Sequence, residues 1–174
     1  MSMTMASLRA LSHPVRLQML SLLTGASFSA AELARELGLT QANASYHLRT
    51  LLAAGVIRAA GTQKVRGGTA KRYRYEPDAP RDSEPGPGRD PGAEMLFAET
   101  LGAELVRRSA HRRTDGRGTT TDAELWVTPE LWHDLRNRVA AAMAELHRAA
   151  RPPRTAGTVR VSATVALFEM HAKP

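Results

Sequence analysis

The beginning of the chain carries apolar residues at the spacing of an amphipathic helix. These positions are Leu8, Leu11, Leu17, Leu20 and Leu23. Recurrence at intervals of three and four residues is typical of a helix that packs one face on a core. Ser12 ahead of Pro14 predicts the N-terminus of this helix, because a first helical turn tolerates proline, and Gly25 predicts its end.

Two further helices follow, separated by about three residues. Ser29 and Glu32 form a capping-box pattern, which predicts a short helix that ends at Gly38. Thr40 predicts the N-cap of the next helix, which stops before Gly55. The apolar side of that helix consists of Ala44, Leu48 and Leu51. Two helices joined by so short a glycine-containing turn predict a helix-turn-helix.

After this third helix the hydrophobic period changes to two. Residues 56–58 and 72–75 each predict a β-strand, and residues 61–70 predict a flexible loop between them. Three helices followed by a hairpin predict a winged helix-turn-helix domain over residues 1–78.

A stretch rich in proline and glycine follows and predicts a linker at residues 79–92. The remaining residues, 93–174, predict a separate C-terminal region for dimerisation and possible effector sensing.

Two helices and two strands are predicted around and beyond the linker. Asp90-Pro91 and Thr128-Pro129 are helix-start patterns, and the helices are expected to run to about residues 113 and 150. Residues 120–127 and 159–168 alternate with period two and predict strands. The fold class is therefore predicted as α+β, an N-terminal winged helix-turn-helix plus a C-terminal helix-strand-helix-strand extension. Because a two-stranded sheet is marginal alone, another chain or the first domain is expected to complete its burial.

The whole net charge of +7 comes from one segment of the chain. Residues 38–75 contain seven lysines and arginines and no acidic residue, whereas the other residues contain 17 basic and 17 acidic ones. A basic block is often only a solvated face. Its coincidence with the third helix and the hairpin favours a polyanionic partner, double-stranded DNA.

The third helix exposes a polar set with little charge. Asparagine and glutamine side chains pair with adenine edges, and hydroxyl groups bond several bases or phosphates. The predicted contacts of this helix are Thr40, Gln41, Asn43, Ser45, Tyr46, His47 and Arg49. The hairpin adds Lys64, Arg66, Lys71 and Arg72 for phosphates or a minor groove. The alternative is an ordinary helix with solvent-facing polar residues.

The sequence resembles ArsR-type (ArsR/SmtB-like) regulators over about residues 5–76. The run ALSHPVRLQMLSLL, residues 10–23, is similar to the family's first helix, and residues 45–49, SYHLR, match its recognition-helix signature. The resemblance implies a dimeric bacterial transcription factor on a near-palindromic operator, with Gln41, Asn43, Ser45, Tyr46, His47 and Arg49 among its DNA contacts. It also implies release by a metal or another effector, and a dimer interface that includes the helix after the linker.

The sequence predicts neither a metal site nor a cofactor. The chain has no cysteine, so thiolate ligands and thiol redox switches are excluded. Its histidines, at positions 13, 47, 111, 133, 147 and 171, form no closely spaced pair. A small-molecule effector remains possible for a pocket of large soft residues in the C-terminal region, Trp126, Trp132, Met143 and Phe168. The alternative is that these side chains form a core or a dimer interface.

Other classes of protein are not supported by the sequence. No stretch of 18 uncharged apolar residues indicates a membrane span, and no secretory signal is recognisable, so we expect a cytoplasmic protein. Nucleophile-elbow, phosphate-loop and HExxH motifs are missing, so we expect no enzyme. The sequence therefore predicts a sequence-specific, dimeric transcriptional repressor. The alternatives are a low-specificity nucleoid-type DNA-binding protein and a protein-interaction module that uses the winged helix for assembly.

Overall fold

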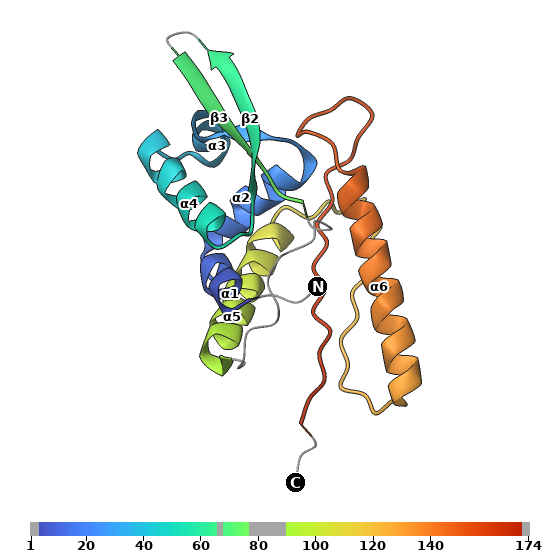
Figure 1. The fold of residues 1–174 in the computed structure, drawn as a ribbon. Coiled ribbons are helices and arrows are strands. Elements are labelled where there is room, and N and C mark those ends of the chain that lie inside the picture. Colours follow the sequence, from blue (N-terminus) through green and yellow to red (C-terminus); the bar gives the residue numbers. More distant parts are fainter. Residues whose placement is uncertain (1–3, 66–67, 77–89, 172–174) are drawn as a thin grey trace.

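A computed structural model of the chain describes residues 4–65, 68–76 and 90–171 (Figure 1). The elements are, in chain order, α1 (Met5–Leu11), α2 (Pro14–Gly25), β1 (Phe28–Ser29), α3 (Ala30–Leu37), α4 (Gln41–Ala53), β2 (Arg58–Val65), β3 (Gly68–Arg74), α5 (Pro91–Ser109) and α6 (Pro129–Ala149). The β2–β3 hairpin projects beyond the cluster formed by α1 to α4, as a wing does (Figure 1). The mixed helix-and-sheet class and the N-terminal winged helix-turn-helix are confirmed. Most of the predicted linker, at residues 79–92, lies outside the described residues.

The helix-turn-helix has the predicted caps at its predicted positions. The backbone N–H of Ser29 donates to the Glu32 carboxylate at 2.7 Å, and the Glu32 N–H donates to the Ser29 hydroxyl at 3.3 Å. Gly38 adopts the left-handed conformation, φ 67°, that ends α3. The Thr40 hydroxyl then accepts from the Asn43 N–H at 3.2 Å and starts α4. Local signals thus fix the relative orientation of the two helices.

The apolar pattern of residues 8–23 belongs to two helices, because α1 precedes the helix that was predicted to begin at Ser12. Ser12 closes α1, its N–H donating to the Leu8 carbonyl at 2.9 Å, instead of capping the next helix. The N-cap of α2 is His13, whose Nδ1 accepts from the Val15 N–H at 3.2 Å. The prediction failed here because serine is the commoner cap, whereas the imidazole of the next residue occupies the same geometric position.

The sheet is antiparallel, with strand order β1-β3-β2. Two predictions about it are wrong. Val56 and Ile57 are buried ahead of the sheet and not part of a strand, and residues 61–65 and 68–70 belong to the strands instead of a flexible loop. The register of β2 shifts between Ala59 and Thr62, and Gly61 takes φ 97° there, so the hairpin continues past the irregularity. The short strand β1 was not predicted.

The core lies inside the winged domain. Its largest fully buried apolar side chains are Met19, Leu23, Leu33, Leu48, Leu51 and Ile57. They come from α2, α3, α4 and the segment before β2, so this core holds α4 in place. Phe97 and Leu101 of α5 also pack against it. Helix α5 is therefore attached to the winged domain.

Helix α5 has one buried and one exposed side. Asp90 caps it as predicted, accepting from the N–H groups of Gly92 and Ala93 at 3.1 and 3.2 Å. It ends at Ser109, one turn earlier than predicted. Its buried residues are Ala93, Thr100 and Glu104, which face α1 and α2. Large apolar side chains remain exposed on other sides: Met95, Leu96, Leu105 and Val106.

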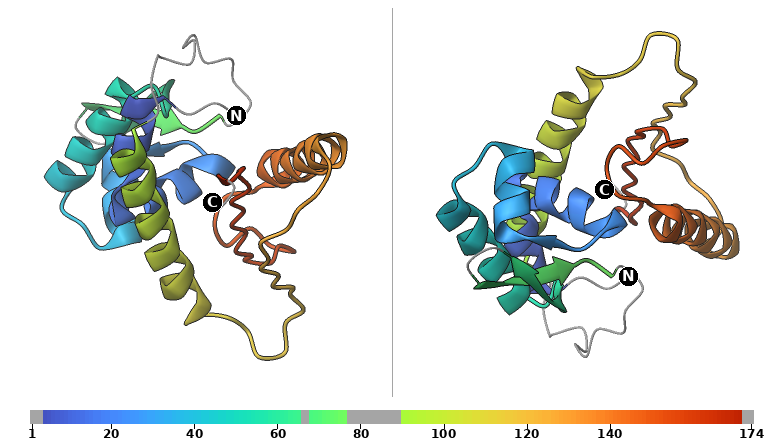
Figure 2. Two further views of the ribbon diagram at one scale, coloured as in Figure 1. Left: turned by 90° about the horizontal axis from the view of Figure 1, so that it is seen from below. Right: turned by 90° about the horizontal axis from the view of Figure 1, so that it is seen from above.

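The two predicted C-terminal strands do not form in the described part of the chain. Residues 120–127 and 159–168 have no strand pairing, and the described C-terminal elements are α5 and α6. The extended segment after α6 runs between α6 and the winged domain (Figures 1 and 2). Thr128 does cap α6 as predicted, with its hydroxyl 3.3 Å from the Leu131 N–H. An alternating pattern predicts which side chains would share one face of a strand. It does not predict whether a neighbouring strand is present to accept the backbone hydrogen bonds.

The segment that follows α6 approaches the winged domain closely beside Gly25. A Cβ on Gly25 would lie 2.6 Å from the carbonyl oxygen of Arg151, so only glycine fits this approach. Nearby, Arg154 takes φ 64°, and its guanidinium bonds the Glu36 carboxylate of α3. The loop after α6 is thereby placed against the ends of α2 and α3.

Candidate nucleic-acid interface

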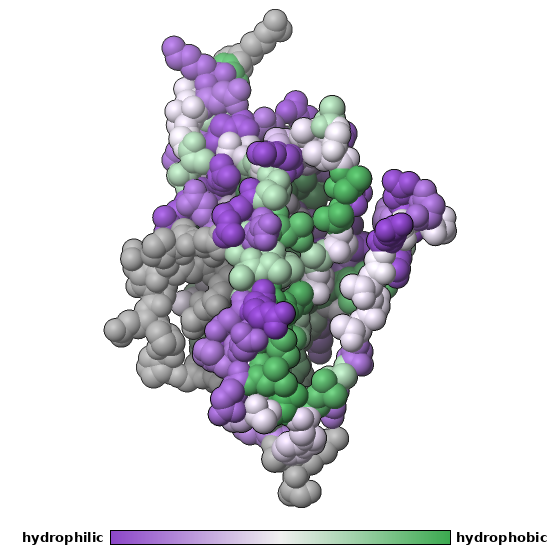
Figure 3. Space-filling model, turned by 90° about the vertical axis from the view of Figure 1, so that its right-hand side faces the viewer, coloured by the Kyte–Doolittle hydropathy of each residue, from purple (hydrophilic) through white to green (hydrophobic). Residues whose placement is uncertain are grey.

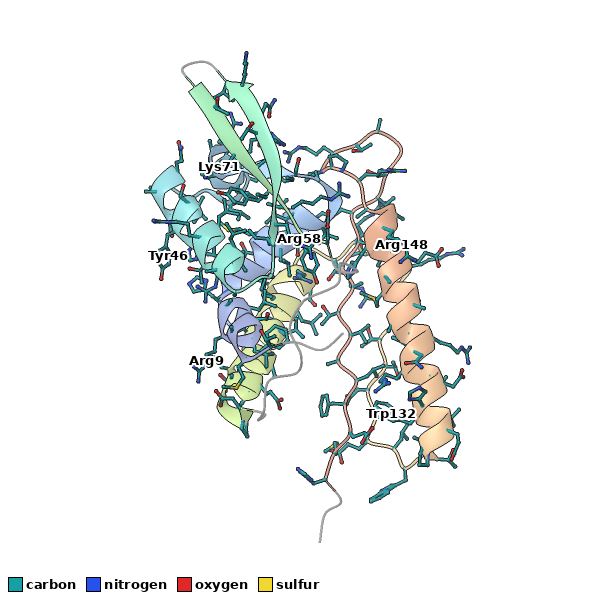
Figure 4. The ribbon with its side chains drawn as sticks, in the orientation of Figure 1. Arg9, Tyr46, Arg58, Lys71, Trp132 and Arg148 are labelled. Carbon is teal, nitrogen blue, oxygen red and sulfur yellow. The ribbon has the colours of Figure 1, made fainter. Side chains whose placement is uncertain are left out.

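Helix α4 separates its apolar and polar residues as the sequence predicts. Ala44, Leu48 and Leu51 are buried, whereas Gln41, Asn43 and Arg49 are exposed. Tyr46 is 56% exposed and projects from α4 away from the core (Figure 4). Of the other predicted contacts, Ser45 is half-buried and Thr40 is exposed at the N-cap. These residues form one polar surface that begins at the N-terminus of α4.

The predicted position of His47 on this surface is wrong. Its side of α4 faces inward, with only 5% of the residue exposed, and its ring lies 4.7 Å from that of His13 between centroids. Its Nδ1 is buried and has no hydrogen-bond partner within the described residues. The spacing already carried the signal, because position 47 continues the buried stripe through 44, 48 and 51.

The two histidines have lowered pKa values. Burial lowers the pKa of His47, and neighbouring His13 and the Arg16 guanidinium lower it further. Burial also lowers the pKa of His13, again with a contribution from Arg16. Both rings therefore favour the neutral form at the junction between α2 and α4.

We expect this pair to make the domain less stable in mild acid. An unfolded imidazole takes up a proton near pH 6.5, whereas the folded rings resist it, so the unfolded state binds more protons as the pH falls below that value. The free energy of unfolding should decrease from pH 7 to pH 5, and His47→Gln should flatten this dependence. Denaturant unfolding at both pH values measures it. The exposed His133 of α6, changed to glutamine, is the control, and an equal flattening by both variants would contradict the assignment.

The wing presents basic side chains on its two long strands. Lys64 on β2 and Lys71 on β3 are exposed, as a phosphate contact requires. Arg58 and Arg74, which belong to the same acid-free segment, are exposed where the two strands pair. The predicted contact Arg66 lies outside the described residues.

The prediction for Arg72 as an outward phosphate contact is not supported by its position. Its Nε donates to the Ser27 hydroxyl at 3.1 Å, and its Nη1 donates to the Glu32 carboxylate at 3.0 and 3.2 Å. Its guanidinium also bonds Gln63 and the Ser27 carbonyl. Sequence reasoning missed Ser27 and Glu32 because they lie 45 and 40 residues from Arg72. It missed Gln63 because residues 61–70 were predicted as a loop.

The predicted C-terminal pocket is not formed. Trp126 is 89% exposed and Phe168 is 66% exposed, so neither encloses a cavity. Trp132 and Met143 are half-buried on α6, and the indole N–H of Trp132 donates to Glu169 at 2.8 Å. Apolar side chains of this region instead form a band at the surface (Figure 3).

The described residues show neither a metal-binding cluster nor a membrane-spanning helix. In residues 4–65, 68–76 and 90–171, no group of three or more histidine, aspartate or glutamate side chains is arranged to hold a metal ion. Among the described helices, none has the length and apolar character needed to cross a membrane.

Comparison with known proteins supports a DNA-binding regulator. Residues 11–59 match the protein family described as a helix-turn-helix domain. This match covers α2, α3 and α4, the elements that form the surface described above. No curated protein matches the chain.

Two solved structures are similar to part of the chain. One is a possible transcriptional regulatory protein (fragment 1-100) from Mycobacterium bovis, with 24% identity over 60% of this chain and 86% of that chain, and a TM-score of 0.33. The other is M. tuberculosis Rv0081, with 25% identity over 59% of this chain and 83% of that chain, and a TM-score of 0.32.

Proposed function

We propose that the chain is a sequence-specific, dimeric transcriptional repressor of the ArsR type, released from its operator by an effector. The observation that carries the proposal is the location of the acid-free segment. Residues 38–75, which hold the whole charge excess, fold into α4 and the wing. Polar groups that suit base edges lie on α4, and basic groups that suit phosphates lie on the wing. We also propose that the chain catalyses no reaction and that it acts in the cytoplasm.

In the proposed complex, α4 enters the major groove with its N-terminal residues toward the bases. Gln41 and Asn43 are exposed in the first turn, where a recognition helix makes its base contacts. Tyr46 and Arg49 follow on the exposed side and reach a thymine methyl, a guanine or a phosphate. Lys64 and Lys71 contact the backbone from the wing. His47 contributes by packing, because it is buried.

A second copy of the chain is proposed to cover the exposed side of α5. Met95 and Val106 lie opposite the face that packs on α1 and α2, and Leu105 lies at the edge between the two sides; the three are between 47% and 72% exposed. Helices of the two copies that meet here would bury these side chains. A two-fold axis between them sets the recognition helices one DNA turn apart, ~34 Å.

The effector is proposed to act through the C-terminal region. Glu104 of α5 is almost fully buried and accepts a hydrogen bond from Gln18 of α2 at 2.7 Å. Arg107 and Arg108 neutralise this carboxylate. A ligand that shifts α5 would therefore pull on α2, which packs against α4.

Selection of bound fragments from genomic DNA with the purified chain tests the proposed function. We expect recovery of a few sites with a shared near-palindromic sequence, and protection of that sequence in a footprint. Recovery of fragments in proportion to their abundance would instead favour the nucleoid-type protein. No binding even at low salt would favour the protein-interaction module.

The wing lysines are expected to set the salt dependence of binding. Each phosphate contact releases counterions, so Lys64→Gln and Lys71→Gln should each lower the slope of log affinity against log salt by about 0.9. Fluorescence anisotropy with one duplex at several salt concentrations measures the slope. Arg136→Gln on α6 is the control. Unchanged slopes in both lysine variants would show that the wing lysines do not contact phosphates.

A further inference from the structure

One arginine of the wing joins segments that are distant in the sequence. Arg72 lies on β3 and bonds Ser27 just before β1, Glu32 in the first turn of α3, and Gln63 on β2. All three guanidinium nitrogens donate within the chain. The side chain of Arg72 is 21% exposed and that of Glu32 is 31% exposed. Arg72 therefore connects the wing to the helix-turn-helix.

The carboxylate of Glu32 has two tasks at once. Its Oε2 accepts from the Ser29 N–H at 2.7 Å, which closes the capping box of α3, and the same oxygen accepts from Arg72 Nη1 at 3.0 Å. Burial raises the pKa of Glu32, but hydrogen bonds from Ser29 and Arg72 lower it further than burial raises it, so the carboxylate stays charged. Because α3 packs on α4, this carboxylate is rigidly placed relative to the recognition helix.

The main-chain pairing adds a second restraint at the same place. Arg72 of β3 pairs with Ser29 of β1, and Phe28 pairs with Tyr73. Strand β1 contributes only two residues, so this ladder alone is a short attachment for a long hairpin. The side-chain bonds of Arg72 lie beside the ladder and fix the angle at which the hairpin leaves the domain.

We propose that Arg72 and Glu32 are positioning residues, which hold the wing at the angle where its lysines and α4 engage one DNA duplex together. The inference rests on the proposed DNA-binding function and goes beyond it, because neither residue touches DNA in this account. Lys71, the neighbour of Arg72, points to the opposite face of β3 and makes the phosphate contact.

The direction in which one substitution changes DNA affinity separates a positioning role from a simple effect of charge. Glu32→Gln removes a negative charge from a surface beside a polyanion, so charge alone predicts tighter DNA binding. Positioning predicts weaker binding, because the ion pair with Arg72 is lost. We expect a loss of about tenfold in operator affinity. Glutamine also serves in a capping box, so the start of α3 is kept.

Glu36→Gln is the matched control. It removes the same charge from the same helix one turn later, and Glu36 bonds Arg154 instead of the wing. We expect its operator affinity to be unchanged or slightly raised. Arg72→Gln should weaken binding as Glu32→Gln does, and both should lower the salt slope alike, because the displaced wing lysines lose phosphate contacts. Arg72→Lys should recover part of the affinity. The double variant should be no weaker than Arg72→Gln, because both changes break one link.

A distance measurement tests the wing angle without DNA. The chain has no cysteine, so Ala42→Cys on α4 and Thr69→Cys on β3 accept spin labels at two sites per chain. Mixing a small share of labelled chain with unlabelled chain keeps the measured pair within one copy. We expect a narrow distance distribution in the otherwise unchanged chain and a broad one with Glu32→Gln or Arg72→Gln. Thermal melts followed by circular dichroism establish that each variant is folded. If Glu32→Gln or Arg72→Gln does not fold, Arg72→Lys takes its place in the distance measurement.

The outcomes separate this inference from the proposed function. If the parent chain binds its operator, but Glu32→Gln binds as tightly and keeps a narrow distance distribution, the positioning role is overturned. A salt slope that is lowered in Arg72→Gln but not in Glu32→Gln would make Arg72 a phosphate contact and also overturn it. If the parent chain binds no DNA, the proposed function fails, and the label distances alone decide whether the pair fixes the wing.

Discussion

Replacing Asn43 with alanine is expected to weaken operator binding by about ten- to a hundredfold and to leave non-specific DNA binding unchanged. Asn43 is exposed in the first turn of α4, where its amide can donate to and accept from one adenine edge. Loss of this pair costs discrimination between bases, whereas phosphate contacts from the wing are untouched. Competition binding with the selected operator and with a scrambled duplex measures both affinities.

The control for this variant lies on the same helix. Thr50→Ala changes the last turn of α4, where the hydroxyl bonds the Tyr46 carbonyl at 3.2 Å. We expect little change in sequence preference from it. Equal losses on the operator and on the scrambled duplex in Asn43→Ala would show that the residue contributes to general affinity, and the base-reading role would be wrong.

Val106→Asp is expected to convert the proposed dimer into a monomer and to lower operator affinity by on the order of a hundredfold. Val106 is 72% exposed in the single chain, so aspartate is tolerated there. In a dimer that buries this side of α5, the same carboxylate would be desolvated without a partner. Light scattering at fixed concentration gives the oligomeric state, and anisotropy gives the affinity for whole and half operators.

Ala140→Asp on α6 provides the comparison. Ala140 is also exposed, and it lies on a different helix from Val106. We expect it to stay dimeric and to bind the operator normally. A dimer that survives Val106→Asp with full operator affinity would mean that the two copies meet elsewhere, or that the protein binds DNA as a monomer.

The helix-turn-helix was predictable because its signals are local. The capping box of Ser29 and Glu32, the glycine at 38 and the cap at Thr40 each act within about four residues. A local hydrogen bond that forms in isolation also forms in the fold when nothing opposes it. The charge distribution was equally readable, since the acid-free segment is continuous in the sequence and folds into adjacent elements.

The errors arose where a residue's partner lies far away along the chain. They also arose where a residue was placed by its polar character, although its spacing along the helix indicated burial. Nothing near Arg72 indicates that Glu32, forty residues earlier, would bind its guanidinium. His47 was placed by its polar character, although its spacing belongs to the buried stripe. Residues 159–168 alternate as well as many real strands do, yet a strand forms only when another edge accepts its backbone hydrogen bonds.

The central claim is that α4 and the wing together read a specific DNA sequence. The most direct test is the affinity of the purified chain for its selected operator, relative to a scrambled duplex of equal length, at one physiological salt concentration. We expect the operator to bind about a thousandfold more tightly or better. Equal affinity for the two duplexes would contradict it.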